Sequence, residues 1–186
     1  MLILLDRDGV LNQDRADYVK SPAEWVPIPG IGPAIAALNA RGWKVVICTN
    51  QACIGKGIID EAMLDRIHDA MRAHIAVDGA RIDDILFAPD PPWAQTERRK
   101  PGPGMMREAM AKYRERPDNT VFIGDTDTDM LAASRAGCRR ILVRSGKGAA
   151  TLAKGLPPEA APVAVFADLA EAVQRLLADG AEAAPL

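Results

Sequence analysis

Two carboxylates stand side by side near the start of the chain. Asp6-Arg7-Asp8-Gly9 follows the apolar run Leu2–Leu5, which places both acids on a tight turn. Two acids this close repel each other, so one of them is protonated or a divalent cation neutralises the pair. Hard oxygen ligands of this kind suit magnesium. The alternative for this tetrapeptide alone is an ordinary turn with solvated acids.

A second acidic cluster spans residues 124–129, with the sequence Gly-Asp-Thr-Asp-Thr-Asp. Its alternating acids resemble the start of a calcium loop, but the required Gly and bidentate Glu do not follow at the right spacing. Asp129 sits where it could cap a following helix, and Asp127 could be a solvated turn residue. Asp125, directly after an apolar run, is therefore the better candidate for a metal ligand.

Groups that could hold an anion lie between these clusters. Thr49-Asn50-Gln51 ends another apolar run and offers a hydroxyl and amide donors, although Thr-Asn is also common in plain turns. Lys100 follows Arg98 and Arg99 and precedes Pro101, where it supplies a fixed positive charge. A basic triplet of this kind usually lies on the solvated surface.

The elements that must position these residues are short apolar runs alternating with amphipathic segments. This alternation predicts an α/β fold, a parallel sheet covered by helices on both faces. The expected strands are Leu2–Leu5, Val45–Cys48, Ile82–Phe87, Val121–Ile123, Ile141–Val143 and Val163–Phe166. Apolar residues at helical spacing predict helices over Gly32–Ala40, Glu61–Val77, Gly104–Tyr113, Asp129–Ala136 and Leu169–Ala178.

Two proline-rich stretches, Asn12–Gly30 and Ala88–Gly104, fit neither helix nor strand. Both leave from the carboxyl ends of expected strands, where open α/β sheets bind ligands. We see no internal repeat and no inserted second domain. We expect a single domain over residues 1–179 and a disordered tail over 180–186.

Composition excludes several classes of function. The 186 residues are 48% hydrophobic and 26% charged, and a net charge of -2 gives no broad attraction for nucleic acid or an anionic membrane. The apolar start meets charged residues after five positions, too early for a signal peptide, so we expect a cytoplasmic protein. Cys48, Cys53 and Cys138 are odd in number and are expected to be free buried thiols.

Other motifs carry less weight. Gly30-Ile31-Gly32 lacks the third Gly of a dinucleotide fingerprint, and Gly146-Lys147-Gly148 lacks the rest of a P-loop. His68 and His74 lie six residues apart on a predicted helix and do not share a face. We therefore expect both histidines to be structural or at the surface.

Taken together, the order Asp-x-Asp-Gly, Thr-Asn, Lys-Pro and Gly-Asp-x-x-x-Asp resembles the haloacid dehalogenase superfamily of phosphohydrolases. Within it, the segments 6–12, 49–51, 55–57 and 99–101 look like the D-glycero-D-manno-heptose 1,7-bisphosphate phosphatases, with histidinol-phosphate phosphatases as near relatives. The similarity continues into residues 147–148 and 152–157 and covers most of the chain. It implies a three-layer, doubly wound parallel sheet of Rossmann-like type without a large cap domain.

The resemblance also implies catalytic roles. Asp6 would be the nucleophile that forms an aspartyl-phosphate, and Asp8 the general acid and base. Mg²⁺ would be held by Asp6, the main-chain carbonyl of Asp8, and Asp125. Asp129 would orient Lys100 or a metal-bound water.

The implied substrate is a small phosphorylated sugar. Thr49, the main chain beside Asn50, and Lys100 would hold the transferred phosphate, and Gln51 would be a further substrate-binding residue. Arg99 or Lys56 would meet a second phosphate. Heptose 1,7-bisphosphate, cleaved at C7, is the favoured substrate, and we expect a monomer. Histidinol phosphate, another small phosphomonoester, and a non-catalytic binding protein on the same fold stay open as alternatives.

The chain departs from the family pattern in one loop. Relatives often bind a structural zinc there through a Cys-x-His pair and a Cys-x-Cys pair. Here the corresponding places are Ala88 and Asp90, then Thr96 and Arg98. No ligand set for zinc remains, so we expect none.

Overall fold

A computed structural model describes residues 1–179, and the expected disordered tail 180–186 lies outside the described residues. Six parallel strands form one sheet in the order β3-β2-β1-β4-β5-β6. The strands are β1 (Leu2–Leu5), β2 (Lys44–Asn50), β3 (Asp84–Ala88), β4 (Thr120–Gly124), β5 (Arg139–Val143) and β6 (Ala164–Phe166). This strand order is that of a doubly wound Rossmann-like sheet, which confirms the predicted fold class.

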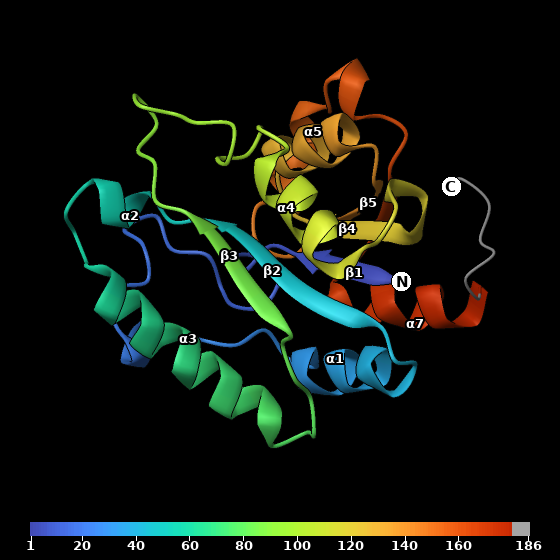
Figure 1. The fold of residues 1–186 in the computed structure, drawn as a ribbon, viewed down its shortest axis with the longest axis horizontal. Coiled ribbons are helices and arrows are strands. Elements are labelled where there is room, and N and C mark those ends of the chain that lie inside the picture. Colours follow the sequence, from blue (N-terminus) through green and yellow to red (C-terminus); the bar gives the residue numbers. More distant parts are fainter. Residues whose placement is uncertain (180–186) are drawn as a thin grey trace.

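Helices cover both faces of the sheet (Figure 1). One face carries α1 (Ile31–Ala40), α3 (Glu61–Ala76) and α7 (Leu169–Asp179). The other face carries α4 (Gly104–Tyr113) and α5 (Asp127–Ala136). Two shorter helices are α2 (Ala52–Gly55) and α6 (Gly148–Lys154), and 3₁₀ turns span Pro22–Glu24, Pro117–Asn119 and Pro158–Ala160.

Strand periodicity explains the two cores. Successive side chains of β1 point to opposite faces, so Ile3 and Leu5 enter one core while Leu2 and Leu4 enter the other. All four are fully buried, as expected for a central strand of a parallel sheet. The apolar positions of β1 therefore fix its register, and with it the place where Asp6 leaves the sheet.

The start of α5 differs from the expectation. Thr126, not Asp129, is the N-cap, and Asp129 completes a capping box from the third helical position. The helix therefore begins two residues earlier than predicted, at Asp127. This arrangement turns the Asp129 side chain back toward the end of β4, where its Oδ2 accepts from Asp125 N at 3.2 Å.

The connection from β1 to α1, residues 6–30, contains a single 3₁₀ turn among its described elements. No cap domain is inserted at this point, in agreement with the prediction. Among residues 1–179, none of the helices combines the length and the apolar character needed to cross a membrane.

Candidate active site

The carboxyl ends of β1, β2 and β4 bring the predicted polar residues to one edge of the sheet. Asp6 and Asp8 follow β1, Thr49 and Asn50 end β2, and Asp125 follows β4. They surround a cavity of about 310 Å³. The lining residues are Asp6, Asp8, Asp14, Arg15, Ala16, Tyr18, Thr49, Asn50, Ala52, Arg99, Lys100, Asp125, Thr126, Thr128, Asp129 and Lys147.

Three buried carboxylates share the floor of this cavity. Asp6, Asp125 and Asp129 each offer an oxygen within 4.8 Å of the others. Lys100, itself 3% exposed, places its Nζ 2.9 Å from Asp6 Oδ1 and 2.6 Å from Asp129 Oδ1. One ammonium thus pairs with two of the three acids, and Asp125 Oδ1 stays buried without a hydrogen-bond partner.

The single ammonium of Lys100 does not balance the charge of three ionised carboxylates in this cluster. Burial, only partly offset by Lys100 and reinforced by the neighbouring acids, raises the pKa of Asp6 to about 7. Burial and the charges of Asp129 and Asp6 raise the pKa of Asp125 to about 8. Hard carboxylate oxygens, one of them unpartnered, suit a divalent cation such as magnesium, which would favour the ionised forms.

Two glycines allow this crowding. A Cβ on Gly9, where φ is +87°, would lie 2.1 Å from Asp125 Oδ2. A Cβ on Gly146, where φ is +57°, would lie 2.3 Å from the same oxygen. Only residues without a side chain fit on either side of the Asp125 carboxylate. The Gly-Lys-Gly segment that resembled a P-loop fragment thus serves to enclose Asp125, and Lys147 N donates to Asp125 Oδ2 at 2.7 Å.

Asp8 is held differently from Asp6. Its carboxylate accepts bonds from Arg7, from Asn12 Nδ2 at 2.8 Å and from Gln51 Nε2 at 3.0 Å. Burial opposes ionisation, but the charge of Arg7 and these bonds outweigh it and hold the pKa of Asp8 below its usual range. Without a bound cation, burial thus favours the neutral form of Asp6, whereas Arg7 and the neighbouring amides favour the ionised form of Asp8.

Thr49, Asn50 and Gln51, at the end of β2, have different partners. Thr49 lines the cavity, and its Oγ1 accepts from Gln51 Nε2 at 2.9 Å. Asn50 Nδ2 donates to the Lys100 carbonyl, and Asn50 Oδ1 accepts from Lys100 N, at 3.0 Å each. These two bonds connect β2 to the loop that carries Lys100. Gln51 is 2% exposed and does not line the cavity, so it orients Asp8 and Thr49 from behind.

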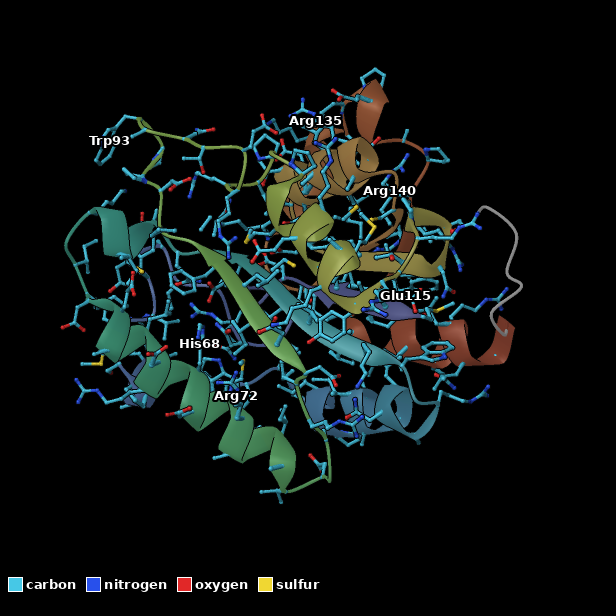
Figure 2. The ribbon with its side chains drawn as sticks, viewed as in Figure 1. His68, Arg72, Trp93, Glu115, Arg135 and Arg140 are labelled. Carbon is cyan, nitrogen blue, oxygen red and sulfur yellow. The ribbon has the colours of Figure 1, made fainter. Side chains whose placement is uncertain are left out.

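The two residues expected at a second phosphate also separate. Arg99 lines the cavity, and its Nη1 donates to the carbonyl of Asp90 at 2.9 Å. Lys56 does not line it. Its Nζ donates to the Tyr18 hydroxyl at 2.7 Å and lies 5.7 Å from the ring centroid of Trp93. Trp93 stands at the outer edge of the loop after β3 (Figure 2).

Several lining residues were not singled out from the sequence. Asp14, Arg15 and Tyr18 belong to the irregular segment after β1, which folds back over the site. Lys147 reaches the same cavity from the far side and pairs with Asp14 at 2.9 Å. No spacing in the sequence indicates the pairing of Asp14 with Lys147, because it joins segments more than a hundred residues apart.

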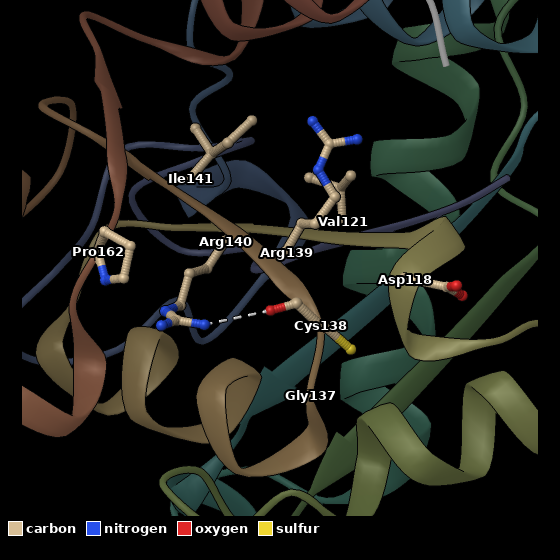
Figure 3. A pocket seen from close by; sticks show the side chains of 8 residues that line it. All are labelled: Asp118, Val121, Gly137, Cys138, Arg139, Arg140, Ile141 and Pro162. Carbon is tan, nitrogen blue, oxygen red and sulfur yellow. Dashed lines mark hydrogen bonds between the residues drawn. The ribbon is translucent and has the colours of Figure 1, made fainter. Parts of the chain in front are cut away.

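A second cavity of about 360 Å³ lies at the opposite, amino ends of β4 and β5 (Figure 3). Its lining residues are Asp118, Val121, Gly137, Cys138, Arg139, Arg140, Ile141 and Pro162. Arg140 donates to the carbonyls of Cys138, Ala160 and Ala161, so its guanidinium holds the main chain together. This cavity does not place two carboxylates together, whereas the first one does.

The loop after β3 closes without thiolates or imidazoles. Asp90 Oδ2 accepts from Thr96 N at 3.0 Å and from the Thr96 hydroxyl, and Arg98 pairs with Glu108. Metal analysis of the purified protein should therefore find no stoichiometric zinc, and a zinc chelator should leave its melting temperature unchanged. One zinc per chain, with unfolding on its removal, would contradict this prediction.

The fold and site are those of a phosphohydrolase of the haloacid dehalogenase (HAD) type. A model of the HAD-hydrolase-like family matches residues 97–172. D-glycero-beta-D-manno-heptose-1,7-bisphosphate 7-phosphatases from Bordetella bronchiseptica and Pseudomonas putida are 43% and 40% identical to the chain. Each alignment covers 95% of this chain and 97% and 99%, respectively, of the relative.

Among solved structures, the D,D-heptose 1,7-bisphosphate phosphatase from B. bronchiseptica, complexed with magnesium and phosphate, superposes with a TM-score of 0.91. It is 42% identical, and the match covers 96% of this chain and 99% of that one. The chain therefore belongs to the D-glycero-D-manno-heptose-1,7-bisphosphate 7-phosphatase family of the HAD superfamily.

Proposed function

We propose that this protein is a magnesium-dependent phosphatase that removes the C7 phosphate of D-glycero-D-manno-heptose 1,7-bisphosphate. The observation that carries the proposal is the juxtaposition of Asp6, Asp125 and Asp129 with Lys100 beside a cavity. The family membership agrees with it, since relatives of this length and identity bear that activity in their names.

In the first step, a carboxylate oxygen of Asp6 attacks the phosphorus, and the bond from phosphorus to the sugar oxygen breaks. Asp8 is ionised in the protein alone, but the negative charge of a bound phosphate favours its protonated form, and it gives that proton to the sugar oxygen, so the sugar leaves as an alcohol. Thr49 and Lys100 would hold the oxygens of the transferring phosphoryl group, where negative charge must be balanced. The product of this step is an acyl phosphate on Asp6, the aspartyl-phosphate.

In the second step, a water attacks the phosphorus, Asp8 takes its proton, and inorganic phosphate leaves Asp6. When bound by Asp6, the carbonyl of Asp8, and Asp125, magnesium supplies positive charge between the nucleophile and the phosphate. Asp129 holds Lys100 in place during both steps, because its Oδ1 lies 2.6 Å from Nζ.

Phosphate release from a panel of sugar bisphosphates and histidinol phosphate, with and without magnesium, tests the proposal. Heptose 1,7-bisphosphate should be hydrolysed fastest, and removal of magnesium should stop the reaction. Faster hydrolysis of histidinol phosphate at equal concentration would assign the substrate to the related phosphatases. Binding of sugar phosphates without any release would favour a non-catalytic binding protein.

Arg99 is the basic residue best placed for the distant phosphate. It is half-buried, lines the cavity and is fixed by the Asp90 carbonyl. Arg99→Ala should lower kcat/KM for the bisphosphate more than for a sugar 7-monophosphate. The difference should be about 1.5–3 kcal/mol, the value of a hydrogen bond to a charged group. Steady-state kinetics on both substrates measures it.

Arg98→Ala is the matched control for this prediction. Arg98 bonds to Glu108 and to the Phe87 carbonyl and does not line the cavity, so its loss should affect both substrates equally. Equal losses in Arg99→Ala would instead mean that Arg99 grips the transferred phosphate or shapes the loop.

We further propose that residues 1–179 form a single domain that acts as a monomer in the cytoplasm. One sheet runs through the described residues. Their exposed large apolar side chains, Val26, Ile58, Val77 and Trp93, come from separate segments. Light scattering coupled to gel filtration should give the mass of one chain, 19.9 kDa.

A further inference from the structure

Arg7 is a buried charged residue that the reaction scheme leaves without a role. Its side chain is 1% exposed, and it lies between the nucleophile Asp6 and the acid Asp8 in the sequence. Nη2 donates to both carboxylate oxygens of Asp8, at 2.9 and 2.8 Å. A guanidinium that bonds both oxygens of a carboxylate fixes its direction as well as its charge. Together with Asn12 and Gln51, the position of Arg7 therefore sets the orientation of Asp8 in the cavity.

His68 contacts the other terminal nitrogen of the Arg7 guanidinium, Nη1. It lies on α3 (Figure 2) and is 3% exposed, and its Nε2 is 3.3 Å from Arg7 Nη1. A guanidinium has only donors, so Nε2 must accept the bond, which requires an imidazole with no proton on that nitrogen. Burial, and next the charge of Arg7, lower the pKa of His68 to about 3. The ring is therefore a neutral acceptor at physiological pH.

The three residues form one buried chain of polar contacts from a helix to the reacting groups. Its links run from His68 to Arg7 and from Arg7 to Asp8, whose carboxylate reaches the cavity. Ordinary packing would place an apolar side chain at this point of α3, as at the neighbouring buried positions Leu64, Ile67 and Met71. A buried histidine here instead meets a specific need for a hydrogen-bond acceptor.

We infer that His68 is a positioning residue for the phosphatase reaction, which orients the acid Asp8 by fixing the guanidinium of Arg7. The inference rests on the proposed function, in which Asp8 transfers the proton to the leaving sugar. Without the acceptor at position 68, Arg7 can turn, and Asp8 then presents its proton less accurately to the leaving oxygen. The loss should fall on the proton transfer and leave the attack by Asp6 largely intact.

Leaving groups of different basicity separate this role from a structural one. A sugar alkoxide needs a proton to leave, whereas a nitrophenolate leaves well without one. Values of kcat/KM for a sugar phosphate and for p-nitrophenyl phosphate compare the two, because they report the steps up to formation of the aspartyl-phosphate. His68→Leu should lose about tenfold on the sugar phosphate, a part of the 10²–10⁴-fold that a positioned acid supplies, and much less on p-nitrophenyl phosphate.

Two further variants complete the design. His68→Gln restores an acceptor at a similar distance from the main chain and should recover most of the rate on the sugar phosphate. His74→Leu is the matched control, since His74 lies on the same helix and contacts the Trp25 ring, 5.5 Å between centroids, rather than Arg7. It should behave like the unmodified protein, and melting temperatures should confirm that all variants are folded.

Equal losses on the two substrates in a folded His68→Leu, or rates unchanged on both, would overturn the positioning role while leaving the phosphatase assignment intact. A failure of His68→Gln to recover more activity than His68→Leu would also count against it. An unmodified protein that releases no phosphate from either ester would instead overturn the proposed function, and the inference with it.

Discussion

Asp6→Asn should abolish phosphate release, whereas Asp8→Asn should retain a rate lowered by about 10²–10⁴-fold, the contribution of a positioned acid or base. The two carboxylates differ because, in the proposed mechanism, Asp6 makes a covalent bond to phosphorus and Asp8 only moves protons. An amide in place of Asp6 is a poor nucleophile and also removes one charge from the proposed metal site. Steady-state phosphate release with saturating magnesium measures both variants.

Trapping identifies the nucleophile independently of the rates. Beryllium fluoride should form its adduct on Asp6, as a mimic of the acyl phosphate, and Asp6→Asn should not bind it. Asp118→Asn is a suitable control, because Asp118 lies by the cavity at the opposite end of the sheet. Normal turnover by Asp6→Asn, or an adduct on another residue, would contradict the aspartyl-phosphate mechanism.

The sequence predicts the fold well because the central strands β1, β2 and β4 are buried and largely apolar on both faces. All six expected strands are present, although β2 runs two residues past the predicted end and includes Thr49 and Asn50. Helices with clear periodicity, such as α3, are also present. The short helices α2 and α6 were not predicted, since four and seven residues are too few to establish a helical pattern.

The predicted site residues that meet in the structure do so for one reason. Asp6, Thr49 and Asp125 each stand at the carboxyl end of a parallel strand, and those ends share one edge of the sheet. Lys100 joins them from a loop. It is buried there and pairs with Asp6 and Asp129. In the sequence alone, Lys100 belongs to a basic triplet, and such triplets are more often exposed to solvent.

What the sequence does not predict is the direction of individual side chains. Gln51 and Lys56 carry the right chemistry for a phosphate, yet Gln51 turns toward Asp8 and Lys56 toward Tyr18. Arg7 and His68 carry no signal of burial, because a charged residue in a turn and a histidine on a helix are usually exposed. Their burial arises from the packing of α3 against the sheet, which is a tertiary contact.

Lys100→Met should lower kcat/KM by at least about 10²–10³-fold, the loss that follows removal of one preorganised donor to the reacting group. The variant also leaves the buried carboxylates of Asp6 and Asp129 without their ammonium partner. Although burial opposes the charged form of Lys100, the carboxylates of Asp129 and Asp6 raise its pKa, so the ammonium is present throughout the working pH range. Breaking such a buried pair costs about 3–5 kcal/mol of the free energy of unfolding.

Magnesium should partly replace the missing charge in Lys100→Met. Its addition should therefore raise the melting temperature of the variant more than that of the unmodified protein, while the catalytic loss persists because the metal does not hold the phosphate where the ammonium did. Lys112→Met is the matched control, since the Lys112 ammonium pairs with Asp84 at 2.6 Å on the protein surface, where a salt bridge contributes about 0–1 kcal/mol. Activity close to normal in Lys100→Met would mean that Lys100 serves only to neutralise Asp6 and Asp129.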